Sequence, residues 1–138
     1  MTWPLLKIAI NGKKFRIQHH GASVGKRDWT RTNSLKLYLA SFFGTCVSHD
    51  EEPPDWLIQG HMHRYIRAAH HGIFRGQHRP IEGVVLPTMQ INSTYILRLA
   101  PEDRSDLGVF WMEVDKTGGV VVHDEYIHRA PEDDYQET

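Results

Sequence analysis

A chain of 138 residues, of which 40% are hydrophobic and 24% are charged, is long enough to bury a core and has the composition of an ordinary globular domain. No apolar run approaches the roughly 20 residues that a membrane-spanning helix needs, and the first residues lack the pattern of a secretory signal. The single cysteine, Cys46, cannot form an internal disulfide, so the cytoplasm is the expected compartment.

The charges and histidines are unevenly distributed, although the net charge is only −1. Residues 13–36 carry seven lysines and arginines against one acid, Asp28, whereas residues 131–138 are acidic. Eight of the ten histidines lie between residues 19 and 78. A basic surface near these histidines would favour an anionic substrate, although solvated loop and helix charges would give the same pattern.

The N-terminal part of the sequence predicts a hairpin and then a helix. Asn11-Gly12 separates the apolar runs 5–10 and 15–19, which is a strong signal for two antiparallel strands. After a polar loop, Thr32-Asn33-Ser34 offers an N-cap for a helix of about ten residues, which we expect to end at Gly44.

The rest of the chain predicts mostly strands. Two prolines at 53 and 54 indicate a loop, after which 55–59 has the pattern of a short buried strand. Asp55 could direct a carboxylate toward a metal, or it could cap the start of that strand. Glycines at 72 and 76 and a proline at 80 interrupt the pattern. The remaining extended segments are expected at 64–71, 83–86, 93–99, 109–114 and 120–127, the last two joined by a hairpin turn at 115–119.

Together these elements predict a mixed α/β layered domain with few helices. A helical bundle or a Greek-key sandwich fits less well, because several strands accompany one well-supported helix. We expect the domain to span residues 1–129 and the acidic residues 130–138 to form a flexible tail.

Two histidine pairs follow predicted strands. Gly60-His61-Met62-His63 comes directly after an apolar run, and His19-His20 ends an earlier one. Side chains two apart on an extended chain project to the same side, so His61 and His63 form a candidate pair of metal ligands. The alternative is that these are surface histidines that bind nothing. We expect His70 and His71 to be exposed strand residues, or residues that contact the metal ligands and not the metal itself.

Four segments carry a family resemblance. They are Gln-His-His-Gly-Ala-Ser at 18–23, Trp-Thr-Arg-Thr-Asn-Ser at 29–34, Pro-Pro-Asp-Trp-Leu-Ile-Gln-Gly-His-Met-His-Arg at 53–64 and Leu-Pro-Thr at 86–88. Together they resemble the C-terminal half of a calcineurin-like metallophosphoesterase of the bacterial and bacteriophage type. The resemblance covers about residues 5–128 and implies half of an αββα layered fold.

The resemblance implies a hydrolase that uses two divalent metal ions, of the kind Mn, Zn, Fe or Mg, to cleave a phosphoester. His19, or alternatively His20, would join His61 on one metal, and His63 would serve the other. His20 could instead contact the phosphate or relay a proton. Basic residues at Lys26, Arg27 and Arg31 would attract the anionic ester. Trp29 could stack on a base of a nucleotide or nucleic acid, or it could pack the loop against the domain.

The chain also departs from the family. The Asp-x-His, Gly-Asp and Gly-Asn-His motifs of the family's first half, which supply the bridging aspartate, do not occur in this sequence. Three imidazoles without a bridging carboxylate suit one zinc-type ion better than a catalytic pair.

Three explanations for this departure stay open. A second polypeptide or copy completes the site; the chain is a binding module that lacks the aspartate half; or the resemblance misleads. In the first case an apolar face would be exposed to a partner. The candidates for such a face are Trp3, Leu5, Trp56, Tyr95 and Trp111.

Overall fold

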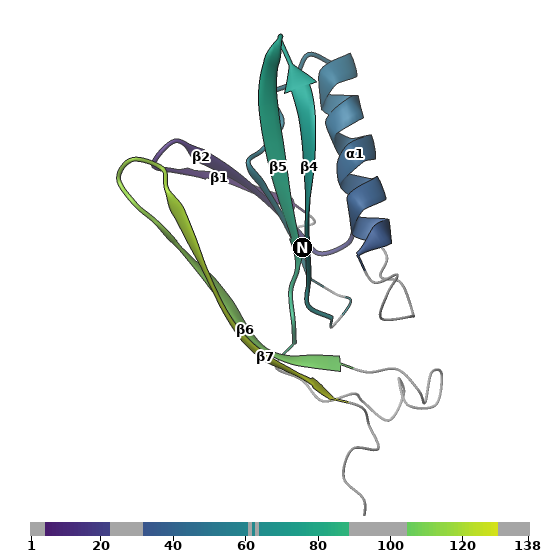
Figure 1. Cartoon of the computed structure of the whole chain (residues 1–138), viewed down its shortest axis with the longest axis vertical. Helices are drawn as coiled ribbons and strands as arrows, with labels where there is room; N and C mark the ends of the chain where they lie inside the picture. Colours follow the sequence, from purple (N-terminus) through teal and green to yellow (C-terminus); the bar gives the residue numbers. More distant parts are fainter. Residues whose placement is uncertain (1–4, 23–31, 61, 63, 89–104, 130–138) are drawn as a thin grey trace, which may run out of the picture.

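The computed structural model describes residues 5–22, 32–60, 62, 64–88 and 105–129, and these form a mixed α/β structure. A five-stranded sheet has the order β1-β2-β3-β5-β4, and a second sheet consists of β6 and β7 (Figure 1). Strands β2, β3 and β5 are parallel, whereas β1 and β4 run antiparallel at the two edges of the larger sheet. The elements are β1 (Leu5–Ile10), β2 (Lys13–Gln18), α1 (Asn33–Ser48), β3 (Trp56–Gln59), β4 (Ile66–Phe74), β5 (Gln77–Val85), β6 (Ser105–Val114) and β7 (Val120–Arg129).

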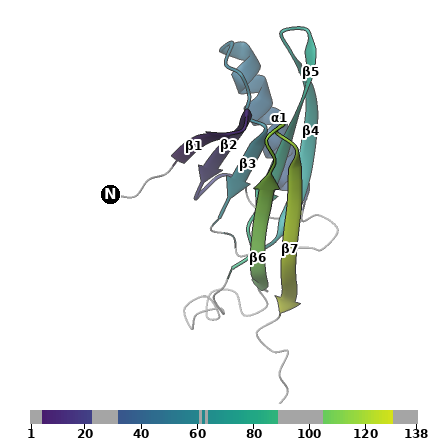
Figure 2. The same cartoon turned by 90° about the vertical axis from the view of Figure 1, so that its left-hand side faces the viewer.

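Another element packs on each face of the larger sheet, which makes the structure layered. Helix α1 lies along β4 and β5 (Figure 1). It buries Leu35, Leu39 and Phe43 against one face of the sheet. The β6–β7 hairpin crosses the other face (Figure 2). There Phe110 and Met112 pack against a cluster around Trp56. The sequence prediction of a mixed α/β domain is therefore confirmed at the level of its class. Within the part of the chain described, no helix is long and apolar enough to cross a membrane.

The first hairpin forms where the sequence predicts it. Asn11 and Gly12 both have positive φ angles, of 49° and 83°, as a two-residue turn of this kind requires. The Asn11 side-chain Nδ2 donates a hydrogen bond of 2.8 Å to the carbonyl oxygen of Asp115 in the β6–β7 turn. This contact ties the tip of the β1–β2 hairpin to the tip of the hairpin that crosses the sheet.

A second hairpin, β4–β5, was not expected from the sequence. Its two-residue turn is Arg75-Gly76, with φ angles of 50° and 77°, so Gly76 closes a hairpin that the interrupted pattern had obscured. Pro80 lies within β5 opposite His71, at a position where β5 has no described partner on its other side. The strand tolerates this proline because no ladder hydrogen bond from its nitrogen is needed there.

Helix α1 is longer than predicted, because it continues through Gly44 to Ser48. Its end is set by Asp50, with a φ angle of 51°, while the Glu51 amide donates to the Cys46 carbonyl at 2.8 Å, as in a Schellman motif. At the start, Thr32 occupies the N-cap, but its side chain makes no capping hydrogen bond. The expected end at Gly44 was wrong because tertiary contacts to the sheet outweigh the local helix propensity of one glycine.

Among the residues proposed for an exposed apolar face, Trp111 is 46% exposed and Leu5 is half-buried. Trp56 is only 6% exposed, because the β6–β7 hairpin covers it. Trp3 and Tyr95 lie outside the described residues, as do the strand predicted at 93–99 and the tail at 130–138.

The close approach of α1 to the sheet gives a test of packing. A Cβ atom added to Gly72 would stand 2.3 Å from Phe43 Cε1 in the core, whereas a Cβ on Gly44 would meet nothing within 4 Å. We expect Gly72→Ala to lower the free energy of unfolding by about 1–3 kcal/mol through overpacking. Gly44→Ala, the matched control in the exposed helix, should raise it by up to about 1 kcal/mol. Urea denaturation measures both, and equal shifts of the same sign would contradict this packing.

A group of ion pairs joins the loop before β3 to the sheet. Glu52 accepts hydrogen bonds from Lys14 Nζ at 2.5 Å and from Arg79 Nη1 at 2.6 Å. Asp55 accepts a hydrogen bond of 2.8 Å from the Lys14 amide, and its carboxylate is 3.7 Å from Arg79 Nη2. Asp55 therefore joins strands at the start of β3, which is the capping role and not the metal-directed one.

The ion pairs of Glu52 predict an acid dependence of stability. Hydrogen bonds from Lys14 and then Arg79 lower the pKa of Glu52 from 4.5 to about 2. A carboxyl whose pKa is lower in the folded state stabilises above its unfolded pKa, so this contribution should be lost as the pH falls from 4.5 toward 2. Because the side chain is 42% exposed, screening limits the loss to about 0.5–1 kcal/mol. Glu52→Gln should flatten the stability profile in this window, and the neighbouring Glu51→Gln should not.

Candidate functional site at the carboxyl ends of the parallel strands

The carboxyl ends of three parallel strands meet at one edge of the larger sheet. Gln18 pairs with Gln59 and Gln59 pairs with Val85, so the loops after β2, β3 and β5 leave the sheet side by side. The Gly60 amide donates to the Gln18 carbonyl at 3.2 Å, and the Leu86 amide donates to the Gln59 carbonyl at 2.8 Å. This edge is where ligands bind in many open α/β sheets.

The first histidine pair lies at this edge, beside the start of the second histidine segment. His19 directly follows β2, and a Cβ atom placed on Gly60 would be 3.8 Å from His19 Nδ1. The His19 and His20 rings meet edge to face with centroids 4.5 Å apart, and both residues are exposed. Parallel pairing thus brings His19 to the glycine that begins the Gly-His-Met-His sequence.

The other predicted ligands lie outside the described residues. His61 and His63 are two of these, and so are the basic residues proposed to attract the substrate, Lys26, Arg27 and Arg31. Between the two histidines, Met62 packs against the helix-side core, and its amide donates to the Gly60 carbonyl at 3.0 Å. The segment is therefore attached to the sheet at its first residue and to the core at its third.

Gln59 holds the loop that follows His20. Its side-chain Nε2 donates to the Ala22 carbonyl and its Oε1 accepts from the Ala22 amide, each at 2.7 Å. Both residues are buried, and Gly21 lies so close that an added Cβ would be 2.6 Å from Gln59 Oε1. A side chain of one strand end therefore fixes the backbone that carries the histidines of the other.

Gln18 occupies the equivalent place on β2. Its Nε2 donates to the Tyr38 hydroxyl at 2.8 Å, and its Oε1 accepts from Arg16 Nε at 3.0 Å. Sequence reasoning missed both glutamines. A signal was present, however, because each strand ends in Ile-Gln immediately before the histidine segment, and the two Ile-Gln pairs lie in register.

Asp106 anchors the far end of the second histidine segment. This aspartate is fully buried, and its Oδ2 accepts a hydrogen bond of 2.7 Å from the Tyr65 amide. Its carbonyl accepts from the Thr88 amide at 2.9 Å, so the loop after β5 is attached to the same residue. Burial, together with a hydrogen bond to Asp124, raises the pKa of Tyr65 above its ordinary range, so this hydroxyl stays protonated. Nothing in the sequence pattern had indicated Asp106.

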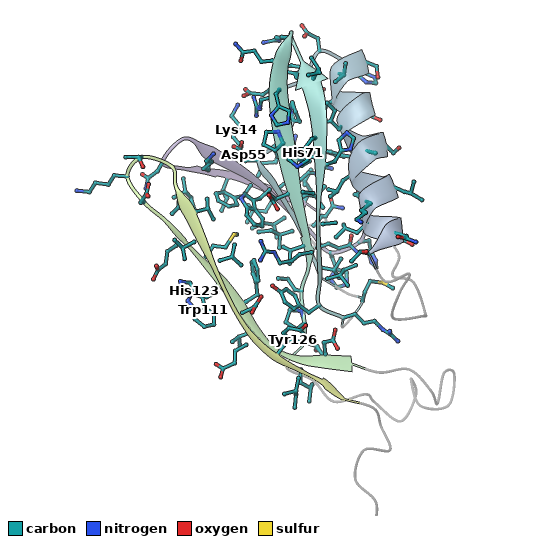
Figure 3. All side chains as sticks on the ribbon, in the orientation of Figure 1. Lys14, Asp55, His71, Trp111, His123 and Tyr126 are labelled. Atoms are coloured by element: carbon teal, nitrogen blue, oxygen red, sulfur yellow. The ribbon has the colours of Figure 1, made fainter. Side chains whose placement is uncertain are left out.

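Four other described histidines make contacts of their own on β4, β5 and β7. His70 packs its ring against Phe43, with centroids 5.2 Å apart, and His71 is exposed on β4 beside His78 of β5 (Figure 3). His123 stacks on Trp111 on the β6–β7 hairpin (Figure 3). The prediction of an exposed strand residue fits His71, whereas His70 is half-buried against α1.

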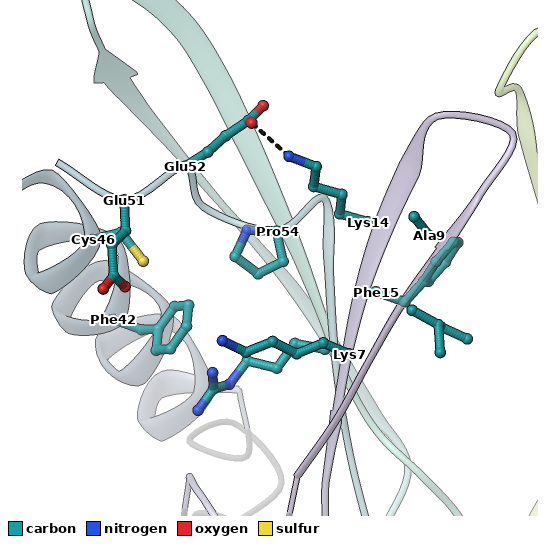
Figure 4. Close-up of a pocket in the computed structure, with 11 residues that line it drawn as sticks. Lys7, Ala9, Lys14, Phe15, Phe42, Cys46, Glu51, Glu52 and Pro54 are labelled. Carbon is teal, nitrogen blue, oxygen red and sulfur yellow. Dashed lines mark hydrogen bonds and ion pairs between the residues drawn. The ribbon is translucent and has the colours of Figure 1, made fainter.

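A separate cavity of about 290 Å³ opens on the helix side of the β1–β2 hairpin (Figure 4). It is lined by Phe42 and Cys46 of α1 and by Lys7, Lys14 and Arg16 of the strands. It adjoins the loop before β3 and is therefore at the opposite end of that strand from the histidines. Burial raises the pKa of the Cys46 thiol, which makes it a poor nucleophile.

The donor atoms at the strand edge limit which metal could bind. Among the residues that the structure describes, no group of three or more histidines, cysteines or acids is placed to hold a metal ion. Imidazole nitrogens suit zinc-type ions, and hard ions prefer carboxylates. A site built from the imidazoles of His19, His61 and His63 would therefore suit one borderline divalent ion, and a pair of ions would need carboxylates from elsewhere.

Comparison with known proteins does not identify the chain. No protein-family model matches the sequence, and no curated protein matches it.

The attachment of the histidine loop by Gln59 can be tested directly. Gln59→Leu leaves the Ala22 amide and carbonyl buried without partners, which should lower the free energy of unfolding by about 2–4 kcal/mol. Hydrogen exchange at the Ala22 amide should become faster than exchange that occurs through global unfolding alone. The matched control is Gln77→Leu, at an exposed glutamine in β5, which should change stability by less than about 0.5 kcal/mol. Unaltered exchange at Ala22 would refute the role of Gln59.

Proposed function

We propose that this chain supplies the histidine half of a two-metal phosphoester hydrolase that acts in the cytoplasm. The enzyme would be a phosphatase, a phosphodiesterase or a nuclease. The observation that carries the proposal is the parallel pairing of β2 and β3, which brings His19 beside Gly60 at the start of the Gly-His-Met-His sequence. The layered α/β structure is compatible with the C-terminal half of a metallophosphoesterase sandwich.

In this proposal the residues of the chain hold the metal and the ester in place. His19 and His61 bind one ion and His63 binds the other, while His20 contacts the phosphate or moves a proton on the leaving oxygen. Lys26, Arg27 and Arg31 attract the anionic phosphoester substrate. Nucleotides and nucleic acids are candidates for this substrate. When bound, divalent ions supply charge neutralisation at the phosphate oxygens and a hydroxide for in-line attack.

The proposal requires a second polypeptide to bring the bridging carboxylate. Support for such a partner comes from apolar side chains on the outer strands: Leu6 is 51% exposed, Ile10 42% and Trp111 46%. A mostly apolar groove of about 300 Å³ runs between β1–β2 and β6, lined by Ile8, Ile10, Phe110 and Trp111 among others. An exposed apolar surface of this kind, beside β1 at the edge of the described sheet, favours association with another chain.

A second candidate function is a metal-binding or interaction module without catalysis. The imidazole-only donor set favours it, because such a set suits a single ion. One measurement distinguishes the two functions. Adding the partner polypeptide to the metal-bound chain should produce phosphoester hydrolysis only if the chain is part of a hydrolase.

We expect the purified chain to lose about one equivalent of bound zinc or a similar ion, by elemental analysis, when His61 is replaced by alanine, and to hydrolyse a chromogenic phosphodiester only together with the polypeptide encoded upstream. His61→Ala and His19→Ala should each lower activity of the pair at least about 100-fold. His49→Ala, at an exposed histidine after α1, is the matched control and should leave activity unchanged. Metal binding without hydrolysis in either preparation would favour the module, and no metal in either would overturn both.

A further inference from the structure

The exposed end of the β4–β5 hairpin carries a histidine pair that the proposed function does not use. His71 lies on β4 opposite Pro80, and His78 lies on β5 opposite Ile73, so the two histidines are diagonal neighbours across the ladder. Side chains alternate along a strand, and His70 faces Phe43 of α1, which puts His71 on the other face of the sheet. Ile73 and its partner His78 share that face.

The two rings already have the separation that a chelating pair requires. His71 Nδ1 is 3.1 Å from His78 Nε2, and the rings are nearly parallel, with an interplanar angle of 12°. Two imidazole nitrogens bound to one ion at about 2.0–2.1 Å stand about 2.9 Å apart in square-planar geometry and about 3.4 Å apart in tetrahedral geometry. The observed separation lies between these two values. It is the length of a hydrogen bond between the two rings, which a bound ion would replace when the rings turn to direct both lone pairs at it.

The hairpin that holds the pair is fixed to the rest of the domain. Arg75 in the turn donates from Nε to Asp50 Oδ1 at 3.0 Å, which ties the hairpin tip to the end of α1. The Arg75 guanidinium also lies over the Phe74 ring, 4.8 Å from its centroid, and Phe74 is buried. A two-residue turn sets the register. The strands therefore hold the histidines in place before any ion arrives, which lowers the entropic cost of binding.

We propose that His71 and His78 form a bidentate site for a borderline divalent transition metal ion, with water completing its coordination. Imidazole nitrogens bind Cu²⁺ more tightly than Ni²⁺ or Zn²⁺, and they bind Mg²⁺ and Ca²⁺ poorly. In the bound form each ring carries its proton on the nitrogen that faces away from the ion. Both histidines are exposed, so the ion can reach them directly from solvent.

This site is separate from the strand edge of the proposed hydrolase. His71 lies five residues beyond Ile66, the first residue of β4 at that edge, which corresponds to roughly 17 Å along an extended strand. One ion therefore cannot use both groups of histidines, and the proposal does not depend on the proposed function.

The experiment titrates the full chain with Ni²⁺ and follows amide resonances by NMR, with calorimetry for stoichiometry. We expect paramagnetic broadening centred on His71 and His78, and Mg²⁺ should produce none. His71→Ala and His78→Ala should each weaken Ni²⁺ binding at the hairpin about 10–100-fold, because a single imidazole remains. The control His49→Ala should leave that binding unchanged, and so should the double variant His19→Ala/His61→Ala, which removes ligands of the proposed hydrolase.

The outcomes separate the two metal proposals. Loss of hairpin broadening in His71→Ala with persistence in His19→Ala/His61→Ala supports the hairpin site, whatever the fate of hydrolytic activity. If Ni²⁺ broadens amide resonances of the wild-type protein but not those of residues 71–78, the hairpin site is overturned. This test does not depend on the folding of any variant. Equal loss of Ni²⁺ affinity in His49→Ala also overturns it, since binding would then reflect isolated surface histidines.

Discussion

The parallel pairing of β2 with β3 is the constraint on which the arrangement of the candidate site depends. Ile17 pairs with Ile58 and Gln18 pairs with Gln59, so the two strands end at the same level. Because the side-chain period of a strand is two, a slip of β3 by one residue would move Gln59 from the helix side to the opposite face. Gln59 would then lose Ala22, and the loop that carries His19 would lose its attachment. The register therefore fixes the site as well as the core.

The two layers that cover the sheet stabilise this register from opposite sides. On the helix side, Leu57 and Ile81 are fully buried beneath α1, which is close enough that Gly72 and Gly83 have no room for a side chain. On the other side the β6–β7 hairpin covers Trp56, and Asn11 joins its tip to the first hairpin. A sheet buried on both faces has apolar residues at successive positions, which explains the apolar pattern of β3.

The parts of the fold that sequence predicted are those specified locally. Asn11-Gly12 encodes its turn in two residues, and the five-residue turn of the β6–β7 hairpin is stabilised by hydrogen bonds to Asp115. The end of α1 and the β4–β5 hairpin were mispredicted, because glycine and proline act there in tertiary contexts: Gly44 continues a helix that packs on the sheet, and Pro80 needs no partner for its nitrogen. At the site, sequence indicated His19 and the edge location, but not Gln59 or Asp106, whose partners are distant along the chain.

The distribution of buried polar groups is the strongest physical argument that this edge has a role beyond folding. In the described part of the chain three polar side chains are buried, those of Gln18, Gln59 and Asp106. Gln18 and Gln59 end two of the parallel strands, and Asp106, near the start of β6, is hydrogen-bonded to Thr88 in the loop after the third. Burying an amide or a carboxylate costs free energy unless each hydrogen bond is made, and apolar residues of similar size would pack there without that requirement. Gln59 instead holds the loop after His20, and Gln18 directly precedes His19. Asp106 holds the backbone at Tyr65, after the second histidine segment. Polar groups that violate the apolar pattern of a core, and that fix the backbone of neighbouring loops, are expected where loop geometry matters for binding.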